Sequence, residues 1–218
     1  MHHPDEYHAA MGHFSRLDLY DPLVRIAVRE LRFKRRLLVH AAIQPGFRVL
    51  DLGCGTGTLA LMAKRSQPGA TIVALDGDAQ ALDLAHAKIA EAGVQIALHH
   101  AFAQQLPYPD AVFDRVLSTL LLHHLSPRGK AAALAEAGRV LRPGGELHVG
   151  DFGRPANWLM RAGFSLVQKF EGKEYTEENG SGRLPELMSN AGLRQVRETA
   201  SFSTAFGTLR LYTALAPS

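Results

Sequence analysis

Glycines and acidic residues gather where the first two expected strands end. Residues 51–57 read D-L-G-C-G-T-G and stand between a short aliphatic run and a helix-like run. A strand, a glycine turn and a helix in this order let the backbone approach a nucleotide-like ligand, because a glycine has no Cβ to collide with it. Asp76 ends the next expected strand, about 20 residues further on, where a carboxylate can accept both hydroxyls of a ribose. The pattern predicts a site for a ligand that contains a ribose.

The spacing of the glycines argues against a dinucleotide. The third glycine is Gly57, which gives G-x-G-x-G, whereas the fingerprint G-x-G-x-x-G requires a glycine in place of Thr58. Asp51 opens the loop, and a carboxylate is a poor neighbour for a phosphate but a good one for a cationic ligand. A nicotinamide-dependent oxidoreductase is therefore the weaker interpretation.

Four segments together carry a resemblance to a known family. They read V-L-D-L-G-C-G-T-G at 49–57, L-P-Y-P-D-A-V-F-D at 106–114, L-H-H-L at 122–125 and R-V-L-R-P-G-G at 139–145. This set resembles the motifs of the class I S-adenosylmethionine-dependent methyltransferases, and most closely their ubiquinone and menaquinone methyltransferase-like branch (methyltransferase type 11). The resemblance implies S-adenosyl-L-methionine as the cofactor and a small molecule as the acceptor, methylated at O, N or C.

The resemblance also implies which residues hold the cofactor. The glycines would pass beneath its methionine part, Asp76 would hold the ribose, and the backbone around Ser118 would meet the amino acid end. The residues implied for cofactor binding are Asp51, Gly53, Cys54, Gly55, Gly57, Asp76, Gly77, Phe102, Ala103 and Ser118. Cys54 itself is expected to be a small buried residue without a redox or nucleophilic role.

One segment departs from the family pattern. Where the family has G-D-A after the third strand, with the Asp on the adenine amino group, residues 101–103 read A-F-A. The adenine contact then rests on the backbone of Phe102 or Ala103, on nearby Gln104, or on stacking by the Phe102 ring. The alternative is that Phe102 packs under the loop.

Three residues are candidates for accepting a proton from the acceptor. His123 and His124 follow the fourth expected strand, and Asp151 ends the fifth. Each lies where a base could reach the acceptor, although a structural or capping role is the alternative for the histidines. The pairs at 99–100 and 123–124 lack a carboxylate or a cysteine at ligand spacing, so we expect no metal site.

The elements that must position these residues alternate regularly after residue 46, which predicts a parallel sheet with crossover helices. The fold class is therefore α/β, a doubly wound, Rossmann-like and mostly parallel sheet. The expected strands are 47–52, 71–76, 94–99, 113–118, 146–151, 193–201 and 208–215, and the expected helices are 57–65, 78–92, 127–141 and 184–191. No helix fits between the last two strands, which should form an antiparallel hairpin.

Two further segments are expected to enclose the acceptor. Residues 1–45 form an N-terminal helical lid, and 152–183 form an insert within the methyltransferase domain, 46–218. The lid helix should begin at Asp21-Pro22 and end at Pro45-Gly46. One side of it is a basic stripe, expected to be a solvated face, with a membrane-surface or anionic-substrate role as the alternative. The stripe consists of Arg25, Arg29, Arg32 and Arg36.

The composition favours one globular domain in a reducing compartment. The chain has 218 residues, 46% of them apolar, and 24 basic against 21 acidic residues give a net charge of +3. A single cysteine, no signal segment and no apolar run near the roughly 18 residues that cross a bilayer predict a soluble, cytoplasmic protein without stable membrane insertion. The small charge and the lack of a binding motif argue against nucleic acid, and nothing indicates an oligomeric state. A non-catalytic S-adenosylmethionine-binding module is the second alternative function, suggested by Phe102 and the basic helix.

Overall fold

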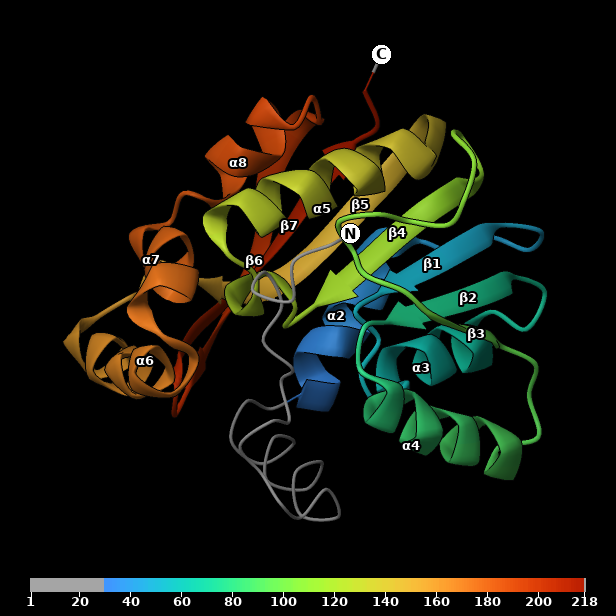
Figure 1. Cartoon of the computed structure of the whole chain (residues 1–218), viewed down its shortest axis with the longest axis horizontal. Helices are drawn as coiled ribbons and strands as arrows, with labels where there is room; N and C mark the ends of the chain where they lie inside the picture. The colour runs from blue at the N-terminus through green and yellow to red at the C-terminus, as the bar shows by residue number, and fades with distance from the viewer. Residues whose placement is uncertain (1–29, 218) are drawn as a thin grey trace, which may run out of the picture.

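A seven-stranded sheet in the order β3-β2-β1-β4-β5-β7-β6 forms the centre of the protein. The computed structural model describes residues 30–217 (Figure 1). The strands are β1 Arg48–Leu52, β2 Thr71–Asp76, β3 Ala97–His100, β4 Phe113–Thr119, β5 Leu141–Gly153, β6 Arg194–Thr204 and β7 Gly207–Leu215. The strands β1 to β5 pair in parallel, and β7 pairs antiparallel with both β5 and β6. The predicted doubly wound sheet and terminal hairpin are confirmed.

Helices cover both faces of this sheet, because successive strand residues point to opposite sides. Val49 belongs to one apolar cluster and the adjacent Leu50 to the other. The cluster of Leu50 includes side chains of α5 (Pro127–Val140) and α8 (Leu184–Asn190). The cluster of Val49 includes side chains of α2 (Glu30–Ala41), α3 (Thr58–Ser66), α4 (Ala79–Glu91) and α6 (Trp158–Glu171). The carboxyl edge of the sheet remains between these layers.

Side-chain caps begin two of the predicted helices. The Asp78 carboxylate accepts the N–H groups of Gln80 and Ala81 at the start of α4. The Ser126 hydroxyl accepts the N–H of Gly129 at the start of α5, whose first residue is Pro127. Such caps satisfy amide groups that have no partner inside the helix, which is why the sequence predicts these starts well.

The lid helix differs from its prediction at its described end. The helix α2 stops at Ala41, because Ala42 adopts a left-handed conformation with φ of 43° before the chain reaches Pro45. Its predicted start at Asp21-Pro22 lies outside the described residues.

Half of the basic stripe can be compared with the structure. Arg25 and Arg29 lie outside the described residues, whereas Arg32 and Arg36 are exposed on α2. Their exposure agrees with a solvated face.

The insert contains two helices that the sequence analysis did not predict. The first, α6, begins after Asn157, whose side chain accepts the N–H of Met160. Gly172, with φ of 90°, separates it from α7 (Lys173–Ser181).

Within residues 30–217, no helix has the length and apolarity needed to cross a membrane.

Candidate functional site

The ends of three parallel strands meet at one edge. Leu52 of β1 is in register with Leu75 of β2 on one side and with Ser118 of β4 on the other. The N–H groups of Gly53 and Cys54 both donate to the carbonyl of Leu75, at 2.9 and 3.0 Å. The loop after β1 therefore lies between the ends of β2 and β4. The predicted cofactor residues of this loop, of the end of β2 (Asp76) and of the end of β4 (Ser118) come together there.

The three glycines of the loop all have positive φ, of 72°, 52° and 74°, but they serve different purposes. A Cβ on Gly53 would lie 2.8 Å from Cδ1 of Leu121, and a Cβ on Gly57 would lie 3.0 Å from the Cβ of Ala85 on α4. A Cβ on Gly55 would meet no described atom within 4 Å. Close packing thus explains Gly53 and Gly57, whereas Gly55 leaves open space against which a ligand could lie.

The Asp76 carboxylate is held facing this loop. Its Oδ2 accepts the N–H of Gly55 at 2.7 Å and its Oδ1 accepts the N–H of Asp78 at 2.9 Å. A carboxylate has about four acceptor directions, so both oxygens could also accept ribose hydroxyls. The carbonyl of Gly77 accepts Nε2–H of His100 at 3.0 Å, which joins the end of β3 to this turn.

Asp51 is a wholly buried carboxyl, and neither of its oxygens makes a hydrogen bond of good geometry within the described part of the chain. Burial raises its pKa to about 7, against the opposing effects of the Lys34 ammonium and of the nearby N–H of Ala60, and with a further increase from Asp76. The buried hydroxyl of Ser118 also lacks a partner among the described residues. Unsatisfied buried polar groups are costly, and a cationic ligand with its own donors would satisfy both. The edge therefore fits the ammonium and sulfonium of S-adenosylmethionine.

The segment expected at the adenine is partly open. Ala103 is buried, whereas the ring of Phe102 is 43% exposed and lies 6.4 Å from the ring of His100. Phe102 is therefore outside the apolar core, and its ring could border a base. The buried Oε1 of Gln104 has no partner within residues 30–217 and could accept an amino group.

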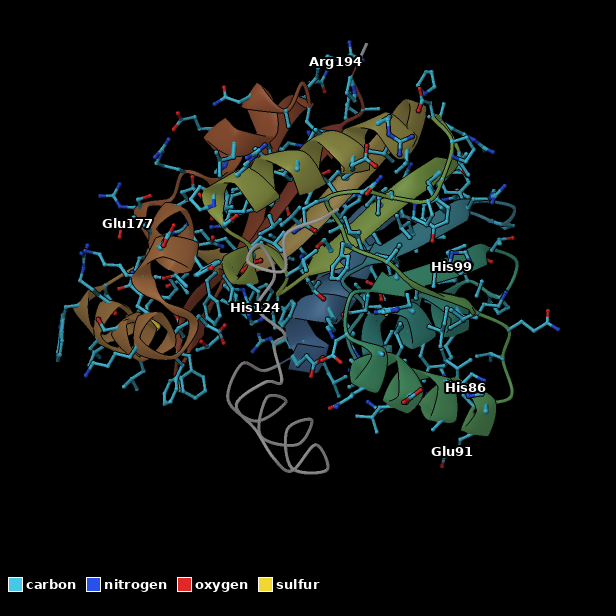
Figure 2. The ribbon with its side chains drawn as sticks, in the orientation of Figure 1. His86, Glu91, His99, His124, Glu177 and Arg194 are labelled. Atoms are coloured by element: carbon cyan, nitrogen blue, oxygen red, sulfur yellow. The ribbon has the colours of Figure 1, made fainter. Side chains whose placement is uncertain are left out.

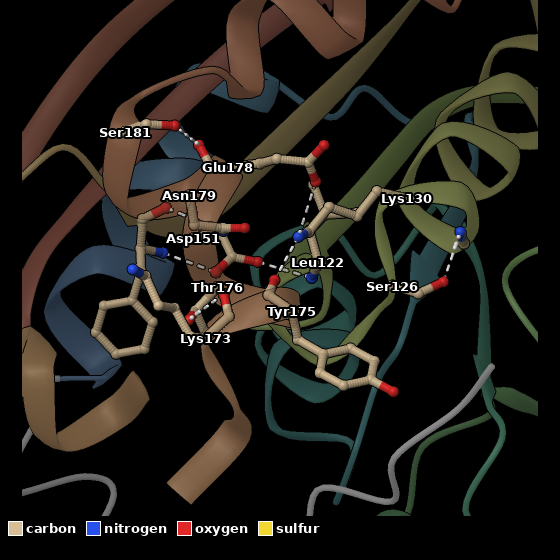
Figure 3. A network of polar contacts seen from close by, with 12 residues as sticks. Leu122, Ser126, Lys130, Asp151, Lys173, Tyr175, Thr176, Glu178, Asn179 and Ser181 are labelled. Atoms are coloured by element: carbon tan, nitrogen blue, oxygen red, sulfur yellow. Dashed lines mark hydrogen bonds and ion pairs between the residues drawn. The ribbon is translucent and has the colours of Figure 1, made fainter. Parts of the chain in front are cut away.

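His123 and Asp151 form a buried pair, with His123 just beyond the end of β4 and Asp151 within β5, two residues before its end. Leu120, with φ of 55°, turns the chain into a short 3-10 helix, η2 (Leu122–His124). Asp151 accepts Nδ1–H of His123 at 2.8 Å and the N–H groups of Leu122 and Phe152 at 2.8 and 2.7 Å (Figure 3 shows the bond from Leu122). These bonds fix the imidazole so that Nε2 is left as an acceptor.

The charge of Asp151 is stabilised despite its burial. Burial alone would raise its pKa, but the adjacent His123 and the N–H of Phe152 hold the pKa below its ordinary value. The carboxyl is therefore ionised at neutral pH. An ionised carboxylate on Nδ1 fixes the orientation of the ring that leaves Nε2 as an acceptor.

The second histidine joins η2 to the insert. His124 Nδ1 donates to Oε2 of Glu171 on α6 at 2.7 Å, and its ring centroid is 4.0 Å from that of His123 (Figure 2 labels His124). Burial lowers the pKa of His124, so this contact is a hydrogen bond of the neutral imidazole. No sequence motif identifies Glu171 as the partner of His124, which is 47 residues away.

A buried lysine attaches the insert beside this pair. Lys130 of α5 is wholly buried, and its ammonium donates to Oε2 of Glu178 on α7 at 3.1 Å and to the carbonyl of Tyr175 (Figure 3). Asn179 of the same helix donates to the carbonyl of Phe152 at 3.1 Å. The contacts fix α7 next to the residue that follows Asp151.

The remaining candidates have local partners. His99 Nδ1 lies 2.7 Å from the hydroxyl of Tyr108. Cys54 is buried as predicted, and burial raises the pKa of its thiol, which therefore remains protonated.

No group of three His, Cys, Asp or Glu side chains within residues 30–217 could hold a metal ion. The expectation of no metal site stays a prediction.

Comparisons with known proteins agree with this geometry. Residues 49–145 match a family model described as a methyltransferase domain. The demethylmenaquinone methyltransferase of Thermus thermophilus is 34% identical over 200 residues, which cover 88% of this chain and 90% of that protein. The ubiquinone/menaquinone biosynthesis C-methyltransferase UbiE of Bordetella parapertussis is 34% identical over 149 residues, 68% of this chain and 57% of that protein. The YcgJ protein of Bacillus subtilis shares the fold, with a TM-score of 0.71 at 16% identity over 86% of this chain and 99% of that chain.

The sheet order and these matches define the class: the chain belongs to the class I S-adenosylmethionine-dependent methyltransferases. Within that class it is of the ubiquinone and menaquinone methyltransferase type. It transfers a methyl group from S-adenosylmethionine to a small-molecule acceptor. The matches favour this activity over the nicotinamide-dependent and non-catalytic alternatives.

Proposed function

We propose that the cofactor lies against Gly55, between Asp76 and the end of β4. The open space at Gly55 and the Asp76 carboxylate facing the loop support this placement, as do the unsatisfied groups of Asp51 and Ser118. Phe102 and Ala103 would border the adenine, with Gly77 and Cys54 as backbone neighbours. When bound, S-adenosylmethionine supplies an activated methyl group on a sulfonium.

The proposed acceptor is an aromatic ring that carries a hydroxyl, such as a reduced quinone precursor, methylated at carbon. The named activities of the Thermus thermophilus and Bordetella parapertussis relatives support this class. The observation that carries the proposal is the His123–Asp151 pair, because a ring carbon becomes strongly nucleophilic when the ring hydroxyl loses its proton. His123 Nε2 would take that proton, while Asp151 stabilises the imidazolium that forms. The methylated ring carbon would then lose its own hydrogen as a proton, which restores the aromatic ring and its hydroxyl.

The acceptor would be enclosed by two segments, the lid at residues 1–45 and the insert at residues 152–183. For the insert, support comes from the bonds of Glu171 to His124 and of Asn179 to the carbonyl of Phe152. Both place insert helices next to the proposed base. Enclosure excludes water and aligns the acceptor, which is the main requirement of a methyl transfer from this cofactor.

A labelling experiment tests the acceptor class. The protein is incubated with S-adenosylmethionine carrying a deuterated methyl group and with a reduced demethylated quinone, and the product is analysed by tandem mass spectrometry. We expect the label on a ring carbon, and no product from the oxidised quinone, which has no hydroxyl to deprotonate. Label on oxygen or nitrogen, or equal reaction of the oxidised form, would contradict the proposal.

Replacing Asp76 with Asn should weaken S-adenosylmethionine binding by about 1.5–3 kcal/mol, the usual range for hydrogen bonds to a charged group. Calorimetric titration measures this change. The matched control is Asp83→Asn, an exposed carboxylate on α4 that should leave the affinity unchanged. If both variants bind like the wild type, the ribose lies elsewhere.

Asp51 should make cofactor binding pH-dependent. Because the pKa of Asp51 is higher in the folded than in the unfolded protein, its protonated form stabilises the fold in acid. This contribution to folding stability is lost as the pH rises to about 7. A cationic ligand favours the ionised form, so binding near pH 6 should release a proton and be weaker by up to about 10-fold than binding above pH 7. Asp51→Asn, titrated at the same pH values so that ligand ionisation cancels, should lack both effects. Equal proton release from this variant would assign the effect to another group.

A further inference from the structure

A cavity of about 430 Å³ lies between the insert helices α6 and α7, which pack against each other (Figure 1). One face of each helix lines it. Arg161, Phe164 and Gln168 share a face of α6, and Lys173 and Glu177 share a face of α7, because residues three or four apart are neighbours on a helix. The volume lies within the range of about 300–1,000 Å³ that is typical of small-molecule sites.

The cavity is lined by three cations and one acid. The cations are Arg154, Arg161 and Lys173, and the acid is Glu177, 4.0 Å from the Lys173 ammonium. Within residues 30–217, neither guanidinium forms an ion pair or a hydrogen bond. Two arginines therefore line one cavity without a counter-ion from the described part of the chain.

The other acids of α6 and α7 do not neutralise these arginines. Glu171 accepts from His124, and Glu178 accepts from the buried Lys130. Glu174 is exposed and does not line the cavity. The two helices together are close to neutral, but the cavity is not, because three cations minus one acid leave a charge of +2 on its lining.

We propose that this cavity binds a small polar molecule through a phosphate group. A guanidinium donates two parallel N–H bonds to a phosphate, which presents three oxygens and up to about two negative charges. It therefore suits Arg154 and Arg161 together, whereas a carboxylate is matched by one arginine. The lining also contains Gln168 and Ser181, whose amide and hydroxyl can bond to the hydroxyls of a phosphorylated polyol or sugar.

The cavity is separate from the cofactor site. The loop at 51–57, Asp76 and Ser118 contribute no residue to its lining. Phe164 connects it to the proposed base, since its ring centroid lies 5.6 Å from that of Phe152, which lies 5.0 Å from that of His123. The occupant would hold α6 and α7 together beside the acceptor site, as a ligand of the insert and not as the methyl acceptor. The proposal does not depend on the identity of the acceptor.

Calorimetric titration of the full-length protein with glycerol 3-phosphate tests the proposal, with inorganic phosphate and glycerol titrated in parallel. We expect saturable binding of both phosphates and none of glycerol. Tighter binding of glycerol 3-phosphate would support a phosphorylated organic ligand, whereas equal binding would support free phosphate. Amide hydrogen exchange should slow in residues 158–181 when either phosphate binds, because the ligand connects the two helices.

Arg154→Gln/Arg161→Gln should weaken phosphate binding about 10-fold or more, because it removes the charged donors. The matched control, Arg128→Gln/Arg183→Gln, removes two exposed arginines outside the cavity and should bind like the wild type. Both variants should keep the wild-type affinity for S-adenosylmethionine.

Three results would overturn the proposal. One is the absence of phosphate binding by the wild type. Another is equal weakening in both double variants, which would show general attraction to a basic surface. The third is competition with S-adenosylhomocysteine, which would place the phosphate in the cofactor site.

Discussion

Replacing His123 with Gln should lower turnover by about 100-fold or more near neutral pH, the usual contribution of a positioned base, without changing the affinity for S-adenosylmethionine. Gln has a similar size and cannot accept and carry the proton. Steady-state rates with an identified acceptor measure the turnover, and calorimetric titration measures the affinity.

The adjacent histidine is the matched control for this prediction. His124 is bound to Glu171 on the insert, so His124→Gln should affect turnover less than His123→Gln. Asp151→Asn should resemble His123→Gln in rate, because the imidazolium loses its stabilising charge. If alanine variants of His123, His124 and Asp151 all keep full activity, the protein catalyses by alignment alone.

The second large effect is on stability. Replacing Lys130 with Met should lower the free energy of unfolding by about 3–5 kcal/mol, because it leaves the largely buried Glu178 carboxylate without its partner. Lys130 is wholly buried, so solvent does not weaken this pair as it weakens a surface pair. Urea unfolding followed by circular dichroism gives the change directly.

Two variants distinguish the loss of the Lys130–Glu178 ion pair from a general loss of packing. Lys130→Met/Glu178→Gln removes both charges and should recover much of the lost stability. Lys173→Met, at an exposed position on α7, should change it by less than about 0.5 kcal/mol. A double variant no more stable than Lys130→Met would show that the lysine acts through its packing and its bond to the Tyr175 carbonyl.

The sequence predicts the elements whose signals are local. Asp78 and Ser126 cap helices a few residues away, and the alternation of strands and helices defines a parallel sheet. The position of the site follows from the same information, because the ends of parallel strands meet at one edge. Asp51, Asp76 and Ser118 are placed together for this reason.

Features that depend on tertiary contacts could not be predicted. Gly55 and Gly57 look alike in the sequence, and only the contact of Gly57 with Ala85 shows that it serves helix packing. Glu171 and Lys130 bond to residues 47 and 48 positions away, with no pattern that connects them. The acceptor side of the site, around His123 and the insert, depends on contacts between residues far apart in the chain. The cofactor side, at the ends of β1, β2 and β4, depends on local patterns, so the sequence predicts it better.

A crystal structure of the protein with S-adenosylhomocysteine tests the central claim most directly. We expect the ribose hydroxyls on the Asp76 carboxylate, the ligand backbone across the open side of Gly55, and the sulfur on the side of Nε2 of His123. A ligand bound at another edge of the sheet, or a sulfur that faces away from His123, would contradict the account.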